Sequence, residues 1–192
     1  MKTYLSRKEA ILLTAIEILD DTGMQGLTIK EIASRQNITE AAIYRHFKSK
    51  QEILIAVLEK FSYFDMNIKN TIMDQKMDVR AGILFYVTSY VEYYQNYPAI
   101  TSLLFAYDML RDEKDALSMT EKITDDRISF LSDFIKEAQG KGEISQTISA
   151  DNMSFALWGT LREIIHMWRR SGYDFSLKGR VLEFVNQFLE VV

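Results

Sequence analysis

The most constraining stretch of this sequence is residues 28–54, TIKEIASRQNITEAAIYRHFKSKQEIL. Thr28 and Glu31 have the S/T-x-x-E spacing of a helix-capping box, in which hydroxyl and carboxylate each satisfy an otherwise unpaired backbone N–H. Ser49 and Glu52 repeat this spacing. The stretch therefore predicts two short helices, a tight break between them, and a third helix that begins at the second box.

The break between the two short helices is predicted at Arg35-Gln36-Asn37. Asn37 suits a sharp corner because Asn tolerates the left-handed backbone region better than most residues. Apolar residues recur at helical spacing on both sides of the break: Ile29, Ile32, Ala33, Ile38, Ala41, Ala42, Ile43 and Phe47. Two short helices joined by a tight turn form a helix-turn-helix, whose second helix lies in the DNA major groove.

The predicted second helix and its flanks also carry polar side chains that suit a duplex. Phenol, hydroxyl, imidazole and ammonium groups are the usual donors to phosphate oxygens, and such contacts set the register on DNA. The candidate DNA-binding residues are Thr28, Lys30, Thr39, Glu40, Ala41, Tyr44, Arg45, His46, Lys48 and Lys50. The alternative is the solvated outer face that any amphipathic helix has.

These residues carry a family resemblance. The segment from about Ser6 to Phe61 resembles the DNA-binding domain of the TetR/AcrR family of bacterial transcriptional regulators. The matching positions are Gly23-x-x-Gly26-Leu27-Thr28, Ile32-Ala33, and Ile38-Thr39-x-x-x-Ile43-Tyr44-x-His46-Phe47-x-Ser49-Lys50-x-x-Ile53-Leu54. This run of spaced matches is far more specific than a bare helix-turn-helix pattern.

Two positions depart from the family pattern. Family members commonly have Gly at the corner that Asn37 occupies here, and a basic or small residue where Glu40 stands. An acidic group repels phosphate but accepts a hydrogen bond from cytosine N4. Glu40 is therefore expected to affect which sequence is read rather than whether DNA is bound.

Charge is distributed unevenly along the 192 residues, whose formal net charge is −4. Residues 1–50 contain eight Lys/Arg and six Asp/Glu, whereas residues 51–192 contain fifteen and twenty-one. Nucleic acid is thus expected to meet only the N-terminal end. The chain has no cysteine, no signal-peptide pattern at its N-terminus, and no apolar run of the roughly 18 residues that span a membrane. A cytoplasmic protein without a membrane partner is expected.

Helical periodicity continues to the end of the chain, and no window shows strand alternation. The sequence predicts an all-α protein of about nine helices: a three-helix, helix-turn-helix head in residues 1–50 and a larger helical body in residues 51–192, which we expect to bind an effector and to dimerise. Later helices are expected at about 49–70, 79–97, 98–110, 116–139, 151–170 and 176–190. Pro98 is expected to open one of them, because the first helical turn does not need its N–H.

Aromatic residues crowd the middle of the chain, and core packing explains most of them. The number of tyrosines is less easily explained, because each buried hydroxyl needs a partner. The family resemblance implies a small-molecule effector held inside the body. Candidates for its lining are Tyr90, Tyr94, Tyr107, Phe130, Phe134, Phe155, Trp158, Arg162 and His166. Arg162 and His166 could bind an anion; alternatively Arg162 pairs with Glu163 or another acidic residue, and His166 is a satisfied interface residue.

The last two predicted helices are suited to self-association, because a helix that is apolar almost all round must be buried by something. In the resembling family they pair with their symmetry mates as a four-helix dimer interface. A homodimer also places two heads about 34 Å apart, one helical turn of DNA, to read a palindrome. The candidate interface residues are Leu157, Leu161, Ile164, Ile165, Trp168, Val181, Phe184, Val185 and Phe188.

Catalysis has little support in the sequence, which has two histidines and no Cys, phosphate loop or metal-binding spacing. No cofactor and no metal site are expected. The combined interpretation is a homodimeric repressor that binds an operator on double-stranded DNA and is released by a small, fairly apolar effector. Two alternatives remain open: an architectural or division-linked DNA-binding protein of this fold without effector, and a helical enzyme or lipid carrier with a vestigial head.

Overall fold

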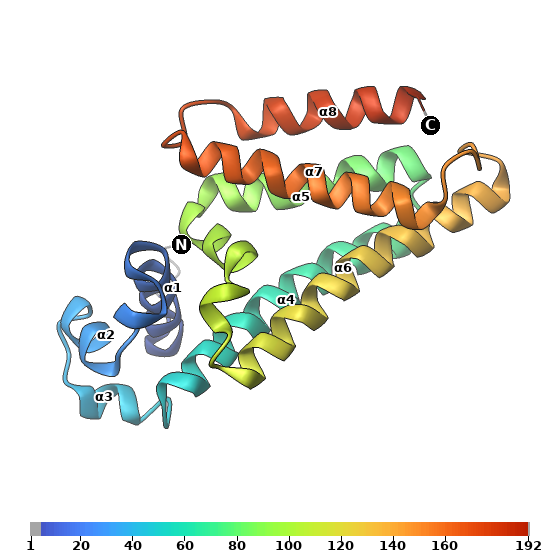
Figure 1. Cartoon of the computed structure of the whole chain (residues 1–192). Coiled ribbons are helices and arrows are strands. Elements are labelled where there is room, and N and C mark those ends of the chain that lie inside the picture. Colours follow the sequence, from blue (N-terminus) through green and yellow to red (C-terminus); the bar gives the residue numbers. More distant parts are fainter. Residues whose placement is uncertain (1–4, 192) are drawn as a thin grey trace. The chain divides into compact units, whose positions relative to one another are not determined.

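The computed structural model describes residues 5–191, which form eight α-helices and two 3-10 helices and contain no strand (Figure 1). The all-α class is confirmed. The elements are α1 (Arg7–Gly26), α2 (Ile29–Arg35), α3 (Glu40–Tyr44), α4 (Lys50–Asp74), α5 (Val79–Asn96), η1 (Pro98–Phe105), η2 (Asp108–Leu110), α6 (Lys114–Lys141), α7 (Ala150–Arg170) and α8 (Leu177–Val191).

The helices gather into two compact units. The first takes in the chain up to Tyr63 together with Ala99–Lys122, and the second takes in Phe64–Pro98 together with the chain from Ile123. Helices α4 and α6 therefore each begin in the first unit and end in the second. This division describes packing; the functional boundary predicted after residue 50 stays a prediction.

Side-chain caps start the helices of the first unit. Ser6 and Glu9 form the complete capping box at α1, with the Ser6 hydroxyl accepting from Glu9 N and the Glu9 carboxylate accepting from Ser6 N. At α2 only half of the box forms: the Thr28 hydroxyl accepts from Glu31 N at 3.0 Å, while the Glu31 carboxylate accepts from Arg35 Nε instead. The helix start predicted at Thr28 is confirmed, and the Glu31 carboxylate pairs within its own helix instead of closing the box.

Positive backbone φ angles occur at helix ends and at the turn between α2 and α3. Asn37 has φ 50° at the corner between α2 and α3, Gly23 has φ 66° near the end of α1, and Gly142 has φ 75° directly after α6. Glycine lacks the Cβ that makes this region strained, and Asn tolerates it. The predicted corner at Asn37 is confirmed.

The α-helix predicted for residues 98–110 is wrong, because this segment forms the two short 3-10 helices η1 and η2. Ser102 Oγ donates to the Ala99 carbonyl oxygen at 2.8 Å and so competes with the backbone for a helical acceptor. Four consecutive residues of η1, Ile100–Leu103, are buried. A segment that is buried on every side has no polar face opposite an apolar one. Its sequence pattern therefore does not distinguish an α-helix from a 3-10 helix.

The core of the second unit lies where α5 and α7 pack against α8, with α8 drawn red beside the orange α7 in Figure 1. Helix α7 begins at the Ser149 cap, whose hydroxyl accepts from Asn152 N, and ends at Ser171. One stripe of α7 is buried and apolar, which is the amphipathic pattern expected of a helix that covers a core. Its large members include Met153, Leu157, Trp158, Leu161, Ile165 and Trp168.

None of the helices in residues 5–191 combines the length and the apolar composition that crossing a membrane requires.

Candidate DNA-binding surface and buried polar cluster

Helix α3 presents the predicted recognition surface in the first unit. The Thr39 hydroxyl caps it by accepting from Ala42 N at 3.3 Å, and Ile43 and Phe47 anchor it in the core with 0% and 1% exposure. The remaining side chains point to solvent, and Tyr44 is 52% exposed. The exposed candidates are Thr28, Lys30, Thr39, Glu40, Ala41, Tyr44, Arg45, His46 and Lys48.

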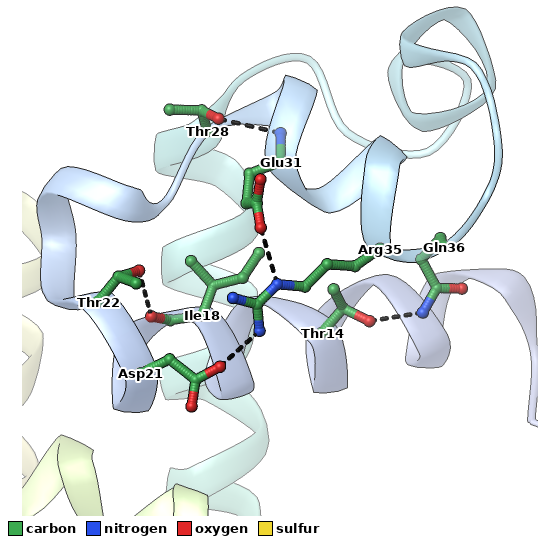
Figure 2. Close-up of polar contacts among 8 residues, drawn as sticks. All are labelled: Thr14, Ile18, Asp21, Thr22, Thr28, Glu31, Arg35 and Gln36. Atoms are coloured by element: carbon green, nitrogen blue, oxygen red, sulfur yellow. Dashed lines mark hydrogen bonds and ion pairs between the residues drawn. The ribbon is translucent and has the colours of Figure 1, made fainter.

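Polar contacts between α1 and α2 stabilise the packing of these two helices on each other (Figure 2). The guanidinium of Arg35 donates to Asp21 at 2.7 Å and to Glu31 at 2.9 Å, and these hydrogen bonds, Glu31 first, raise the pKa of Arg35. Gln36 Nε2 donates to Thr14 Oγ1 on α1. Exposed ion pairs contribute little each, but together these bonds fix where the corner begins, and with it the direction of α3.

The start of α4 differs from the sequence prediction at Lys50. Ser49 Oγ accepts from Glu52 N at 3.1 Å, while the Glu52 carboxylate accepts from Lys48 N rather than from Ser49. Lys50 Nζ lies 3.2 Å from a Glu113 carboxylate oxygen, within the first unit. Lys50 is therefore an ion-paired and partly buried cation, whereas the sequence prediction treats it as a solvated donor to phosphate.

The candidate effector residues separate when the chain folds. Tyr90, Tyr94 and Trp158 lie together in the core of the second unit, with ring centroids 5.9 Å (Tyr90–Tyr94) and 6.1 Å (Tyr90–Trp158) apart. Phe130 and Phe134 stack on each other at 6.0 Å and extend this aromatic group along α6. These five residues form part of one cluster.

The other four candidates do not join this cluster. Tyr107 is 54% exposed and belongs to the first unit, and Phe155 is 56% exposed on α7. His166 is exposed with its Nδ1 3.6 Å from Glu163, and Arg162 is half-buried with an interaction partner. Whether Arg162 and His166 bind an anion, or Arg162 pairs with an acidic residue and His166 is a satisfied interface residue, stays a prediction.

A buried ion pair that the sequence reading missed lies within the aromatic cluster. Arg127 Nε and Nη2 donate to the two carboxylate oxygens of Asp65 at 2.6 and 2.8 Å, and the Tyr90 hydroxyl donates to the same carboxylate at 2.7 Å. Arg127 is 1% exposed, and its guanidinium carbon lies 4.9 Å from the Tyr90 ring and 5.1 Å from the Trp158 ring. A buried bidentate pair of this kind is strongly destabilised if either partner is removed.

The sequence does contain a signal for this pair, in the spacing of charged residues among apolar ones. Arg127 falls four residues after Ile123 and four before Leu131, and Asp65 falls four after Phe61. Both charges thus occupy positions on the buried face of a helix. A charged residue at a core position needs a partner, and this argument would have found both.

Burial changes the acid–base properties of this cluster. It raises the pKa values of Tyr86, Tyr90 and Tyr94 well above their ordinary value, because the charged phenolate is disfavoured away from water. It lowers the pKa of Lys69, whose ammonium donates to the Asp126 carbonyl oxygen at 2.6 Å. All three tyrosines are therefore neutral hydroxyl groups at physiological pH.

A groove of about 380 Å³ lies on the same unit between α4 and α5. Phe64 and Tyr93 form part of its wall, with ring centroids 4.2 Å apart, and Phe64 also packs edge-on against Tyr90 at 5.7 Å. Phe64 thus contacts both the groove and the aromatic cluster. In residues 5–191 no group of three or more His, Cys, Asp or Glu side chains is placed to hold a metal ion.

Most of the predicted dimer-interface residues are covered by their own chain. Phe184 and Phe188 stay half-exposed on α8, with ring centroids 5.8 Å apart. The buried members are Leu157, Leu161, Ile164, Ile165, Trp168, Val181 and Val185. The apolar surface that these residues leave for a second copy is therefore smaller than their composition suggests.

Comparison with known proteins agrees with this geometry. Residues 11–57, which span α1 to α3 and the start of α4, match the family of bacterial regulatory proteins described as the tetR family. The chain is 43% identical over 53 residues to the class C tetracycline repressor protein of Escherichia coli, which covers 28% of this chain and 24% of that protein. It thus spans about a quarter of the length of that relative.

Two further similarities extend over nearly the whole chain. The nucleoid occlusion factor SlmA of Vibrio cholerae is 20% identical over 172 residues, 89% of this chain and 88% of that protein. The structure of the transcriptional regulator FadR from Bacillus subtilis in complex with stearoyl-CoA has a TM-score of 0.76 at 17% identity and covers 95% of this chain and 98% of that one. The second similarity concerns the fold alone.

The capped, core-anchored α3 with its exposed polar face defines a helix-turn-helix DNA-binding protein. The matched residues then identify this part of the chain: residues 11–57 match the tetR family of bacterial regulatory proteins, and the rest of the chain shares the fold of regulators of similar structure.

Proposed function

We propose that this chain is a ligand-responsive transcriptional repressor that binds a palindromic operator as a homodimer and is released by a small, fairly apolar effector. The observation that carries the proposal is the exposed polar face of α3, which Ile43 and Phe47 anchor in the core at 0% and 1% exposure. Phenol, hydroxyl, imidazole and guanidinium groups held on a rigid helix are what phosphate and base contacts require.

The effector part of the proposal is supported by the aromatic and polar core of the second unit. A mostly apolar site with a few oriented polar groups is the usual design for small ligands. The FadR structure of similar fold holds stearoyl-CoA. Since α4 and α6 run unbroken through residues of both units, an effector that binds two conformations of the second unit unequally would change operator affinity.

The homodimer would use the exposed stripe of α7 and α8 instead of their buried one. Phe155 and Met167 are 56% and 43% exposed, Gly159 is exposed between them, and Phe184 and Phe188 keep part of their rings in solvent. We expect Phe155→Glu to give a monomer by light scattering and to lose operator binding. Tyr63→Glu, at 61% exposure in the first unit, is the control that stays dimeric.

The deciding experiment is binding of the purified chain to the DNA upstream of its own gene, followed by selection from the whole genome, with random competitor DNA at near-physiological salt. The proposal expects a selected palindrome bound by two chains at nanomolar concentration. Binding no tighter than to random DNA in both assays contradicts it.

A second candidate function has one specific observation in its favour. The near full-length similarity to a nucleoid occlusion factor supports an architectural DNA-binding protein without effector. Genome-wide occupancy separates the two: scattered sites along the chromosome support this candidate, whereas one or a few operators near regulated genes support the repressor.

A further inference from the structure

Three buried hydrogen-bond donors in the second unit lack a partner among the described residues. The Tyr94 hydroxyl on α5 and the Trp158 indole N–H on α7 are both enclosed by protein, as is the Tyr86 hydroxyl, and none of these three atoms has a hydrogen-bond acceptor among the described residues. Tyr94 is 0% exposed and Trp158 is 4% exposed. A buried donor without an acceptor is destabilising. Stability therefore does not explain why the core contains these donors, whereas binding of a ligand would.

These donors flank the ion pair rather than being scattered through the core. The Tyr94 and Trp158 rings each pack against Tyr90, at 5.9 and 6.1 Å between centroids, and the Trp158 ring is 5.1 Å from the Arg127 guanidinium. Tyr90 itself is satisfied by Asp65, which is also paired with Arg127. The cluster therefore contains a carboxylate that already accepts three hydrogen bonds and, on two rings that pack against Tyr90, donors without acceptors.

The charge balance of the cluster limits what it could bind. Asp65 and Arg127 neutralise each other through two hydrogen bonds. An added anion or cation would be a buried charge without a counter-charge, which is strongly unfavourable. The indole N–H only donates, so a ligand group that pairs with it must accept, and a neutral carbonyl oxygen is such a group.

The groove between α4 and α5 provides a route by which a ligand would enter the cluster. Phe64 lines the groove and packs edge-on against Tyr90, and it is tilted against Tyr93 at 4.2 Å. The Phe64 and Tyr93 rings are both partly exposed, and Phe64 is the side chain that contacts the groove on one side and the Tyr90 ring on the other. The surroundings on this route are aromatic, which favours a flat apolar ligand.

We propose that Tyr94 and Trp158 form the recognition end of an effector site for a neutral, mainly aromatic molecule, which they bind through its carbonyl oxygen. The molecule enters from the groove past Phe64 and Tyr93. This inference rests on the effector-responsive function proposed above and specifies the chemistry of its ligand.

The test uses the full-length chain and three probes that share one skeleton: benzophenone, diphenylmethane, which lacks the carbonyl, and 4-benzoylbenzoate, which adds a negative charge. Dissociation constants are measured by calorimetry. We expect benzophenone to bind at least tenfold more tightly than either of the other two. In Tyr94→Phe and in Trp158→Phe the preference over diphenylmethane falls below threefold.

Trp168→Phe is the matched control, because Trp168 lies on the same helix with the same 4% exposure and should keep the tenfold preference. The proposal is overturned if benzophenone fails to bind, if diphenylmethane binds equally well to the wild-type chain, or if both Phe variants keep the preference. It is also overturned if Tyr94→Phe lowers the melting temperature by more than 5 °C, since its hydroxyl would then already be hydrogen-bonded.

Selection of DNA by the same proteins separates this inference from the proposed function. Operator binding without a carbonyl preference refutes the ligand chemistry and leaves the repressor intact. A carbonyl preference in a chain that selects no DNA supports the site and refutes the repressor.

Discussion

The α3 surface of the first unit and the buried cluster of the second use similar side chains under opposite conditions. Tyr44 and Arg45 are exposed, so water satisfies them until a duplex replaces it. Tyr90 and Arg127 are almost fully buried and depend on Asp65. The comparison teaches that removal of an exposed group should affect binding and leave the fold intact, whereas removal of a buried one should affect the fold first.

The largest effect expected from this comparison is at Arg127. Arg127→Met leaves the Asp65 carboxylate buried without its counter-charge, so we expect the free energy of unfolding to fall by about 3–5 kcal/mol. Urea denaturation of the purified variant measures it. The triple variant Asp65→Leu, Tyr90→Phe, Arg127→Met removes all three partners together and should recover most of the loss. An Arg127→Met variant within 1 kcal/mol of wild type would show that the pair is not the support we describe.

Tyr44→Ala is the exposed counterpart. It removes a donor at 52% exposure without creating a cavity, so stability should change little. Loss of a hydrogen bond to a charged phosphate should weaken DNA binding by about 1.5–3 kcal/mol. Specific and random duplexes should weaken about equally, because a phosphate contact carries no sequence information. Fluorescence anisotropy with both duplexes checks this, and a changed base preference at full affinity would refute the assignment.

Glu40→Ala should act on selectivity instead. The exposed carboxylate at the start of α3 is the group suited to accept from cytosine N4, and a good base contact discriminates by about 1–3 kcal/mol. We expect the preferred operator to change at one base pair while binding to random DNA stays the same or tightens. Selection from a randomised duplex library measures it, and an identical preferred site would remove Glu40 from the readout.

The sequence predicts most of the exposed side of this comparison and little of the buried side. The helix-turn-helix, its corner at Asn37 and the exposed polar face of α3 follow from local spacing, which acts within one or two helical turns. The pairing of Asp65 with Arg127 joins residues 62 positions apart and depends on how two helices meet. Periodicity places each of them on an inward face but does not identify the partner.

Alkaline pH should affect the buried tyrosines selectively. Because burial raises the folded-state pKa of Tyr94 above its ordinary value near 10, the stability it contributes is intact below pH 10 and is lost as the pH rises above that value. At pH 11 the loss is about 1.4 kcal/mol for each such tyrosine. Tyr94→Phe should reduce the drop between pH 9 and pH 11 by this amount, as thermal unfolding can show. Tyr63→Phe, at an exposed site, is the control, and an equal drop in Tyr94→Phe would contradict the expectation.

The smallest effect is expected at Glu113, which holds Lys50 at 3.2 Å. Glu113→Gln frees the ammonium for phosphate and removes a negative charge, so DNA affinity should rise by at most about 1 kcal/mol, the range of a surface ion pair. Anisotropy at fixed salt measures the change, with Asp115→Gln as the control at the neighbouring acidic position. Weaker DNA binding by Glu113→Gln would show that the carboxylate instead positions Lys50 for the duplex.

The same ion pair also affects how salt influences DNA binding. A lysine that neutralises a phosphate normally releases a condensed counterion, which adds about 0.9 to the slope of log affinity against log salt concentration. Lys50 already has a neutralising carboxylate. As long as the lysine stays with Glu113 it neutralises no phosphate and releases no counterion from DNA, so it would add almost nothing to this slope, whereas Glu113→Gln should add about 0.9 to it.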